Sequence, residues 1–163
     1  MESYQRPSWD EYFIEVMDAI AKRATCGRGR SGCVIARDNQ LLVTGYVGSP
    51  VGLPHCDEVG HQMKKVIHVD EGNKETEHCV RTVHAEQNAI LYAAKNNVSL
   101  EGATIYVTLS PCVACSKVLF SLGIKKVYYL NSYAEYKGIP NDEGVDFLKK
   151  FGVDVERYIL NNN

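Results

Sequence analysis

Apolar positions change their spacing along the chain, and each spacing predicts an element. In residues 8–24, which begin with the suitable helix cap Ser8, helical spacing separates the apolar side chains of Tyr12, Phe13, Val16, Ala19 and Ile20. Two strand-like runs follow over residues 31–38 and 40–48. They meet at Asp38-Asn39, which predicts a hairpin-like link.

The second half of the chain alternates regularly between helical and strand patterns. The predicted order is helix 83–96, strand 103–109, helix 112–123, strand 125–130, helix 142–152 and strand 153–160. Strands that alternate with helices of this length indicate right-handed crossovers and an α/β layered domain. The chain of 163 residues is therefore interpreted as one domain over residues 1–163.

Residues 49–81 break this regularity. They lack clear periodicity and are rich in Pro, Gly, His and Asp. A structureless loop of this length is unusual in a compact domain, so we predict an ordered, Cys/His-rich insertion at about 49–81.

Composition and charge exclude several classes of protein. The chain is 45% hydrophobic with a formal net charge of -2, and no apolar run approaches the roughly 18 residues of a membrane span. The first residues carry acids and aromatics where a signal peptide has basic residues and an apolar core, so a cytoplasmic location is expected. No membrane or nucleic-acid partner is expected, because the pairs Lys125-Lys126 and Lys149-Lys150 look like ordinary solvated faces.

The cysteines and histidines favour metal binding over disulfides. Cys112 and Cys115 form a C-x-x-C pair, and four of the five histidines lie between residues 55 and 78. Ser110 is a natural helix cap and Pro111 a natural first helical residue, which places both cysteines on one face of a first turn. A helix N-terminus lowers thiol pKa values and favours the thiolates that a metal requires.

Residues 82–87 read TVHAEQ and open the preceding helix, with Thr82 as the expected cap. His84 and Glu86 are two apart and would diverge in a helix interior, but both can curl over a helix start. Together with Cys112 and Cys115 this spacing is the H-x-E…P-C-x-x-C signature of zinc deaminases. His84 and the two cysteines would bind zinc, which lowers the pKa of a water ligand to roughly 7, and Glu86 would carry the proton.

Each half of the signature has an ordinary alternative. A lone C-x-x-C can be redox-active or half of a structural zinc site, and a lone histidine at a helix start is usually a capping or core residue. Glu86 alone would be interpreted as a solvated acid. Both halves at helix openings, with a strand between them, favour the zinc site.

Five stretches carry a wider resemblance: RPSWDEYF, TGYVGSPVGLPHC, HCVRTVHAEQNAIL, GATIYVTLSPCVAC and GIKKVYY. They resemble the deoxycytidylate (dCMP) deaminase family and cover most of residues 6–133. The resemblance implies a cytidine deaminase-like α/β fold, with three α/β/α layers and a mixed five-stranded sheet flanked by helices. It also implies zinc-dependent hydrolytic deamination of dCMP to dUMP with release of ammonia, a step that supplies the dTMP precursor.

The resemblance also assigns expected roles to residues around the substrate. The backbone N–H of Ala85 and the carbonyl of Ser110 would hold the edge of the pyrimidine, while Glu86 would move protons to ring N3 and to the departing amino group. Arg28, in TCGRGR, is the candidate for the nucleotide phosphate, with a solvated turn residue as the alternative.

One position departs from the family pattern. Relatives usually read GYNG where this chain reads Gly45-Tyr46-Val47-Gly48, and Val47 cannot make the expected hydrogen bond to the sugar. Another side chain supplies that bond, the sugar sits differently, or the preferred substrate has changed. Gly48 and Ser49 are candidates to line the pocket through their backbone.

Several members of the family carry a second, structural zinc. The expected ligands here are Cys26, Cys56, His61 and Cys79, with His78 as the first replacement, and the alternative is buried thiols and surface histidines. Such a site would explain how residues 49–81 stay ordered. Cys33 lies in an apolar strand and is expected in the core.

Alternative functions come from other classes. The chain could deaminate another cytidine nucleotide or nucleoside, or an adenosine in transfer RNA, or it could be a catalytically silent zinc domain. Glu86 argues against the silent domain, because a structural site has no use for that acid. The resemblance further implies a homo-oligomer, with a hexamer as one form, and dCTP and dTTP as regulators.

Overall fold

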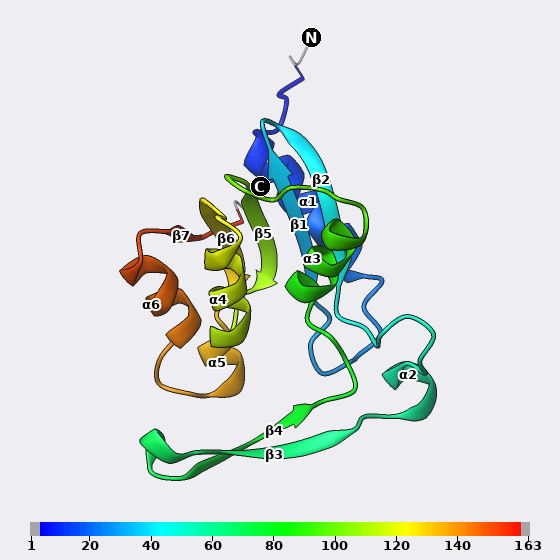
Figure 1. Cartoon of the computed structure of the whole chain (residues 1–163), viewed down its shortest axis with the longest axis vertical. Coiled ribbons are helices and arrows are strands. Elements are labelled where there is room, and N and C mark those ends of the chain that lie inside the picture. The colour runs from blue at the N-terminus through cyan, green and yellow to red at the C-terminus, as the bar shows by residue number, and fades with distance from the viewer. Residues whose placement is uncertain (1–3, 161–163) are drawn as a thin grey trace.

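The computed structural model describes residues 4–160, and its centre is a five-stranded sheet in the order β2-β1-β5-β6-β7 (Figure 1). β1 pairs antiparallel with both β2 and β5, whereas β6 runs parallel to β5 and β7. The predicted mixed five-stranded sheet is therefore confirmed. Its strands are β1 Gly32–Arg37, β2 Gln40–Tyr46, β5 Thr104–Leu109, β6 Lys126–Asn131 and β7 Asp154–Arg157.

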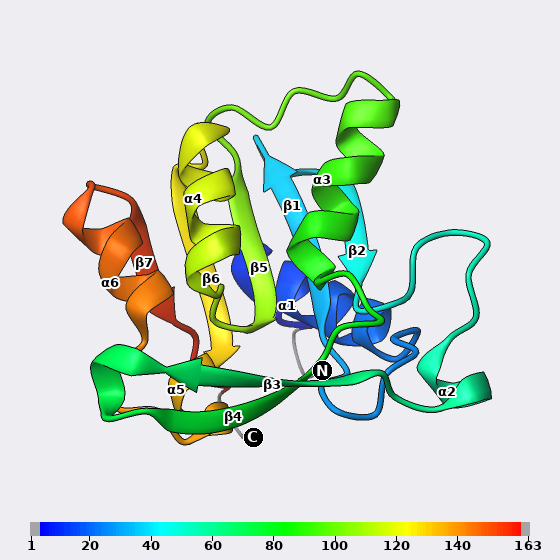
Figure 2. The same ribbon diagram turned by 60° about the horizontal axis from the view of Figure 1, so that its bottom comes forward.

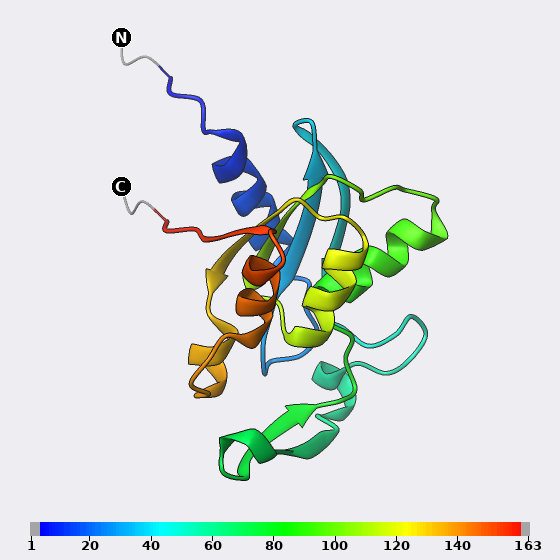
Figure 3. The same cartoon turned by 60° about the vertical axis from the view of Figure 1, so that its left-hand side comes forward.

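Helices cover both faces of this sheet (Figure 3). Val34 of β1 packs with Phe13 and Met17 of α1 on one face, while Ile35, the next residue, packs with Ala89 of α3 on the other. Alternate strand residues point to opposite faces, so β1 contributes side chains to the hydrophobic clusters on both faces of the sheet. The three predicted layers are confirmed by α1 Trp9–Ala21 on one face and α3 Ala85–Lys95, α4 Val113–Ser121 and α6 Glu143–Lys150 on the other.

Local chemistry sets the early elements as predicted. The Ser8 side chain accepts from the backbone of Glu11 and the Glu11 carboxylate accepts from Ser8, which forms a capping box at α1. Asp38 and Asn39 both have positive φ, 53° and 60°, and make the tight turn between β1 and β2. A Cβ on Gly45 would lie 2.2 Å from the Ala85 carbonyl oxygen, so β2 packs closely against the start of α3.

The N-caps expected for the helices now labelled α3 and α4, Thr82 and Ser110, were wrong. α3 begins at Ala85 with His84 as its N-cap, because Val83 pairs with Gly48 in a β-bridge and keeps the chain extended. α4 begins at Val113 with Cys112 as its N-cap, two residues later than Ser110 would have placed it. Both shifts move a predicted metal ligand from the first turn to the N-cap position.

Residues 49–81 form α2 Cys56–Val59, β3 Met63–His68, the short 3-10 helix η1 Val69–Glu71 and β4 Lys74–Cys79. β3 and β4 pair antiparallel in a sheet of their own. This hairpin crosses in front of the sheet end and lies beside α5 Tyr133–Lys137, a short helix that sequence patterns did not predict (Figure 2). Among the described residues, no helix is both long and apolar enough to cross a membrane.

Candidate active site

Three metal-type donors meet where α3 and α4 begin. Nδ1 of His84 lies 3.6 Å from Sγ of Cys112 and 3.5 Å from Sγ of Cys115. A tetrahedral zinc with Zn–S bonds near 2.3 Å separates its ligand atoms by about 3.8 Å, so the donor set and its spacing fit zinc. We call these residues the three-donor cluster.

Proton sharing within the three-donor cluster favours a thiolate. A hydrogen bond from Cys115 lowers the pKa of Cys112 to about 4, and the same bond raises the pKa of Cys115. The pKa of His84 is raised chiefly by its hydrogen bond with Cys112. Negative charge is therefore favoured on the Cys112 sulfur, while Cys115 keeps its proton, and a thiolate is the form that binds a metal.

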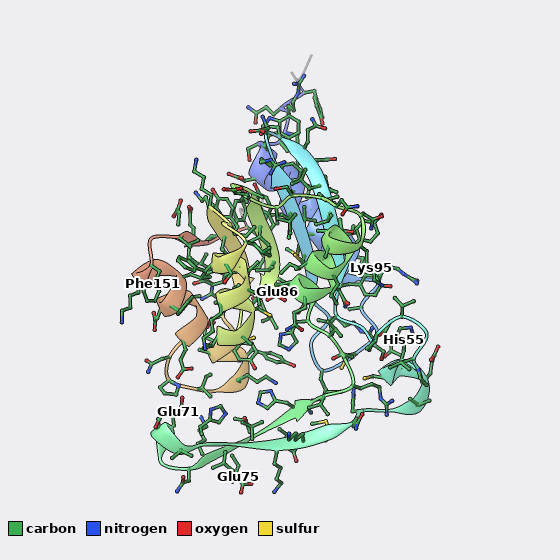
Figure 4. All side chains as sticks on the ribbon, viewed as in Figure 1. His55, Glu71, Glu75, Glu86, Lys95 and Phe151 are labelled. Atoms are coloured by element: carbon green, nitrogen blue, oxygen red, sulfur yellow. The ribbon has the colours of Figure 1, made fainter. Side chains whose placement is uncertain are left out.

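Glu86 lies beside this cluster at the start of α3, between α3 and α4 (Figure 4). Its side chain is only 7% exposed, and burial raises the pKa of its carboxyl group. A buried carboxyl with a raised pKa in a cavity is suited to accept and release a proton near neutral pH.

A cavity of about 510 Å³ opens over these groups, a volume within the usual range for a small ligand. The predicted substrate residues that line it are Arg28, Val47 and Ser110. Val47 lies in the lining, and its backbone donates to the Ser31 carbonyl and accepts from the Thr25 N–H at 3.0 Å each.

Three predicted substrate residues do not line this cavity. Gly48 exchanges backbone hydrogen bonds with Val83, so its backbone groups are committed elsewhere. The Ser49 hydroxyl donates to the Pro54 carbonyl at 2.8 Å. Ala85 is buried behind the cavity wall, against β2.

The structure also adds residues that sequence reasoning missed. The wall of the cavity includes Tyr133, Tyr136 and Lys137 from α5, and Lys64, Val66 and His78 from the hairpin. In open α/β sheets, ligands bind beyond the carboxyl ends of the strands. Because α5 follows the carboxyl end of β6, this rule could have flagged it, whereas nothing in the local pattern placed the hairpin.

A second carboxylate braces the loop that carries Cys112. Oδ2 of Asp142 accepts from Oγ of Ser110 at 2.6 Å and from Oγ of Ser132 at 2.8 Å. The Ser110 hydroxyl in turn accepts from the backbone N–H of Tyr133 at 2.7 Å, which explains why it does not cap α4. A Cβ on Gly144 would lie 1.9 Å from the Pro111 carbonyl oxygen, so the start of α6 packs directly against the loop that carries Cys112.

The four residues expected to hold a second metal also lie together. Their donor atoms are within 4.8 Å of one another, with 3.6 Å between Cys26 Sγ and His61 Nδ1 and 3.5 Å between Cys56 Sγ and Cys79 Sγ. We call them the four-donor cluster. His78, the expected replacement, lies outside it and is bonded to Thr76 at 2.8 Å. Cys33 is a buried core residue, as predicted.

The layered fold and the His–Cys–Cys–Glu site at two helix starts define a class, that of the zinc-dependent deaminases. Residues 7–131 match the family described as the cytidine and deoxycytidylate deaminase zinc-binding region. The chain belongs to this family, and the resemblance inferred from its motifs is confirmed.

Individual relatives and a solved structure support this family assignment. ComE operon protein 2 of Bacillus subtilis is 39% identical over 156 residues, which are 96% of this chain and 74% of that protein. The deoxycytidylate deaminase of Schizosaccharomyces pombe is 37% identical over 97% of this chain, but the match spans only 46% of the yeast protein. The dCMP deaminase of cyanophage S-TIM5, solved in complex with dCMP and dUMP, has a TM-score of 0.72 and 28% identity, with 95% of this chain and 100% of that chain covered.

Proposed function

We propose that this protein is a zinc-dependent hydrolase that deaminates dCMP to dUMP and releases ammonia. The observation that carries the proposal is a buried carboxyl, Glu86, beside the three-donor cluster in a nucleotide-sized cavity. The relatives named deoxycytidylate deaminase and the cyanophage structure with dCMP and dUMP support the choice of substrate.

His84, Cys112 and Cys115 would hold the zinc ion, and they leave one tetrahedral position for water. Bound there, zinc supplies the polarisation that lets water lose a proton near neutral pH. The thiolate character of Cys112 and the Nδ1 atom of His84, which faces both sulfurs, suit this role.

Side chains of the protein carry out the proton transfers. Glu86 accepts a proton from the attacking water and delivers it to ring N3, while the water oxygen bonds to C4. Glu86 then carries the second proton to the amino group, the C4–N bond breaks, and ammonia leaves. We assign the edge of the pyrimidine to the carbonyl of Ser110, which lines the cavity and whose hydroxyl is held by Asp142. The Ala85 N–H, expected to hold the same edge, belongs to a residue outside this lining and is not assigned a contact.

The sugar side of the cavity is apolar at Val47, whose backbone is already bonded. We therefore assign Val47 a packing contact with the deoxyribose in place of the hydrogen bond that the family resemblance implies there. Arg28 faces the same cavity and remains our candidate for a phosphate contact.

The four-donor cluster would hold a second, structural zinc. Its three cysteine thiols and one histidine supply four ligands, which is the number that fills a tetrahedral structural zinc site. This site joins the loop before β1 to α2 and to the end of β4, which supports a role in ordering residues 49–81. A cytoplasmic location, a homo-oligomer and regulation by dCTP and dTTP stay predictions.

Ammonia release from dCMP, CMP and deoxycytidine, measured side by side on purified protein, tests the activity. We expect dCMP to be the preferred substrate, and absence of ammonia from all three would overturn the proposal. Metal analysis of the same sample is expected to give about two zinc ions per chain by the ligand count of the two clusters. A value near one would remove the second site.

A further inference from the structure

Gln87 is a cavity residue that the proposed mechanism does not use. It is the third residue of α3, directly after Glu86, and it belongs to the cavity lining with a partly buried side chain. Its side-chain oxygen, Oε1, accepts from the backbone N–H of His84 at 3.3 Å. Gln and Glu often make this contact at the third position of a helix, where they bond the N–H of the capping residue. The contact identifies the oxygen end of the amide, because the nitrogen end cannot accept.

The nitrogen end of the Gln87 amide is unpaired among residues 4–160. Nε2 carries two N–H donors, and Oε1 makes the hydrogen bond that this side chain forms in the described part of the chain. The nitrogen is not sealed in the interior either, since Oε2 of Glu71 is the one fully buried side-chain nitrogen or oxygen without a partner among the described residues. An accessible, unused donor on a cavity wall is available to a ligand that fills the cavity.

A backbone bridge sets Gln87 close to Val47. Gly48 and Val83 exchange hydrogen bonds at 3.3 and 2.9 Å in an antiparallel bridge. One residue further along the same pairing, Val47 lies opposite His84. Because the Gln87 oxygen is bonded to the N–H of His84, its amide belongs to the stretch of cavity wall near Val47.

Two further contacts hold the start of α3 against the end of β2. Nδ2 of Asn88 donates to the carbonyl of Tyr46, the last residue of β2, at 2.8 Å. A Cβ on Gly45 would lie 2.5 Å from the Ala89 backbone nitrogen, so no side chain separates the two elements there. The start of α3 therefore keeps a fixed position relative to Val47, which follows β2 directly.

The sugar of dCMP offers one group that needs a partner on this wall. Its deoxyribose carries a single free hydroxyl, at C3′, because C2′ has none and the 5′ oxygen is esterified to phosphate. Val47, which we assign to the sugar, has no group that can bond this hydroxyl. A hydroxyl that enters a partly closed site without a partner loses the hydrogen bonds that it made with water.

The hydroxyls of Ser31 and Thr82 also belong to the cavity lining. The hydrogen of each hydroxyl can rotate, whereas the Gln87 amide is held at its oxygen end by the His84 N–H. A donor that is already held in place loses less freedom when a ligand binds. This fixed orientation distinguishes Gln87 from the two hydroxyls.

We propose that the Gln87 amide donates a hydrogen bond to the 3′-hydroxyl of the substrate and makes the enzyme prefer nucleotides that carry this hydroxyl. The inference rests on the proposed deamination of dCMP and makes Gln87 a specificity-determining residue. The sugar then keeps a hydrogen bond although Val47 cannot supply one. Gln87 follows Glu86 directly in α3, so one helix start positions both the proton carrier and the sugar.

The test compares kcat/KM for dCMP with kcat/KM for 2′,3′-dideoxycytidine 5′-monophosphate, which lacks only the 3′-hydroxyl. The parent protein is expected to favour dCMP by roughly 5-fold, the effect of one neutral hydrogen bond in a partly exposed site. In Gln87→Met, which keeps an unbranched side chain but has no N–H, the ratio should fall to about one. The lost bond to His84 weakens the cap of α3 for both substrates alike, so it does not enter the ratio.

Affinity for the product gives a readout that does not depend on turnover. Measured by calorimetry, dUMP should bind the parent protein more tightly than 2′,3′-dideoxyuridine 5′-monophosphate, and this difference should vanish in Gln87→Met. Thr82→Val and Ser31→Ala are the matched controls, because each removes a hydroxyl from the same lining and should keep the parent's ratio.

An unchanged ratio in Gln87→Met, or a parent protein that uses both nucleotides equally well, would overturn the proposed contact. A ratio that collapses in Thr82→Val or Ser31→Ala instead would assign the 3′-hydroxyl to that residue and overturn it as well. A parent protein that releases no ammonia from dCMP would overturn the proposed function itself.

Discussion

The three-donor and four-donor clusters use the same kinds of donor atoms, yet their surroundings differ. His84 and Cys112 are the N-caps of α3 and α4, two helices packed on the central sheet, and buried Glu86 lies beside them in a cavity. The four-donor cluster instead links segments that lie outside the sheet, and its fourth donor comes from exposed His61.

The comparison shows what separates a proposed reactive metal site from a proposed structural one. Three donors leave a tetrahedral position open, and the acid next to it has a pKa raised by burial. Four donors close the coordination sphere, so a metal there can only hold chain segments together. The two clusters use the same ligand types, so the number of donors and the presence of a neighbouring acid distinguish the proposed reactive site from the proposed structural one.

The strongest way to break this distinction is Glu86→Gln. We expect ammonia release from dCMP to fall by about 1,000-fold, because the amide cannot carry a proton. Zinc content should stay that of the parent protein, since Glu86 is not one of the three donors. A variant that deaminates dCMP as fast as the parent would show that the acid beside the three-donor cluster has no role in the chemistry.

Cys79→Ser addresses the other cluster. We expect it to lose one zinc per chain and to lower the free energy of unfolding by about 4 kcal/mol, as loss of a structural metal does. Thermal unfolding and metal analysis measure both effects. Cys33→Ala, which removes a core thiol outside both clusters, is the control and should retain the parent's zinc content. Full zinc content in Cys79→Ser would contradict the assignment.

Asp142→Ala tests the brace on the three-donor loop. It leaves the Ser110 hydroxyl, which is buried, without its acceptor and should cost about 2 kcal/mol of unfolding free energy. We also expect kcat for dCMP to fall by roughly 10-fold with zinc content unchanged, because Ser110 and Cys112 would be held less firmly. Asp146→Ala, on the exposed side of the same helix, should change neither quantity. Equal kcat values for the two variants would reduce Asp142 to a purely structural residue.

The smallest effect is expected from Asp57→Asn near the four-donor cluster. Arg30 Nη2 lies 3.0 Å from Asp57 Oδ1, but both side chains are nearly half exposed. Exposed ion pairs contribute little, so we expect a loss of less than about 1 kcal/mol in unfolding free energy, with kcat and zinc content unchanged. Chemical denaturation of the variant and parent measures the difference, and a loss as large as that of Cys79→Ser would mean that the pair helps to hold the metal.

Much of the architecture was readable from local patterns. Helical spacing before β1, the Asp38-Asn39 turn and the alternation of helices and strands after residue 82 all predicted the elements that form. Local patterns failed where tertiary contacts compete for the same groups. The Ser110 hydroxyl is satisfied by Asp142 and Tyr133, so α4 starts later than its capping signal suggested.

By itself the sequence determined the sheet, its helices and the donor residues, because periodicity and the H-x-E…P-C-x-x-C spacing depend on short stretches of chain. Only the tertiary structure decided which residues surround the substrate. It left Gly48 and Ser49 outside the lining of the cavity, and it brought Lys64 and Lys137, 73 positions apart in the numbering, to that lining. Long-range proximity of this kind depends on how the β3–β4 hairpin and α5 are placed in the fold, and the spacing of neighbouring residues in the sequence carries no signal for it.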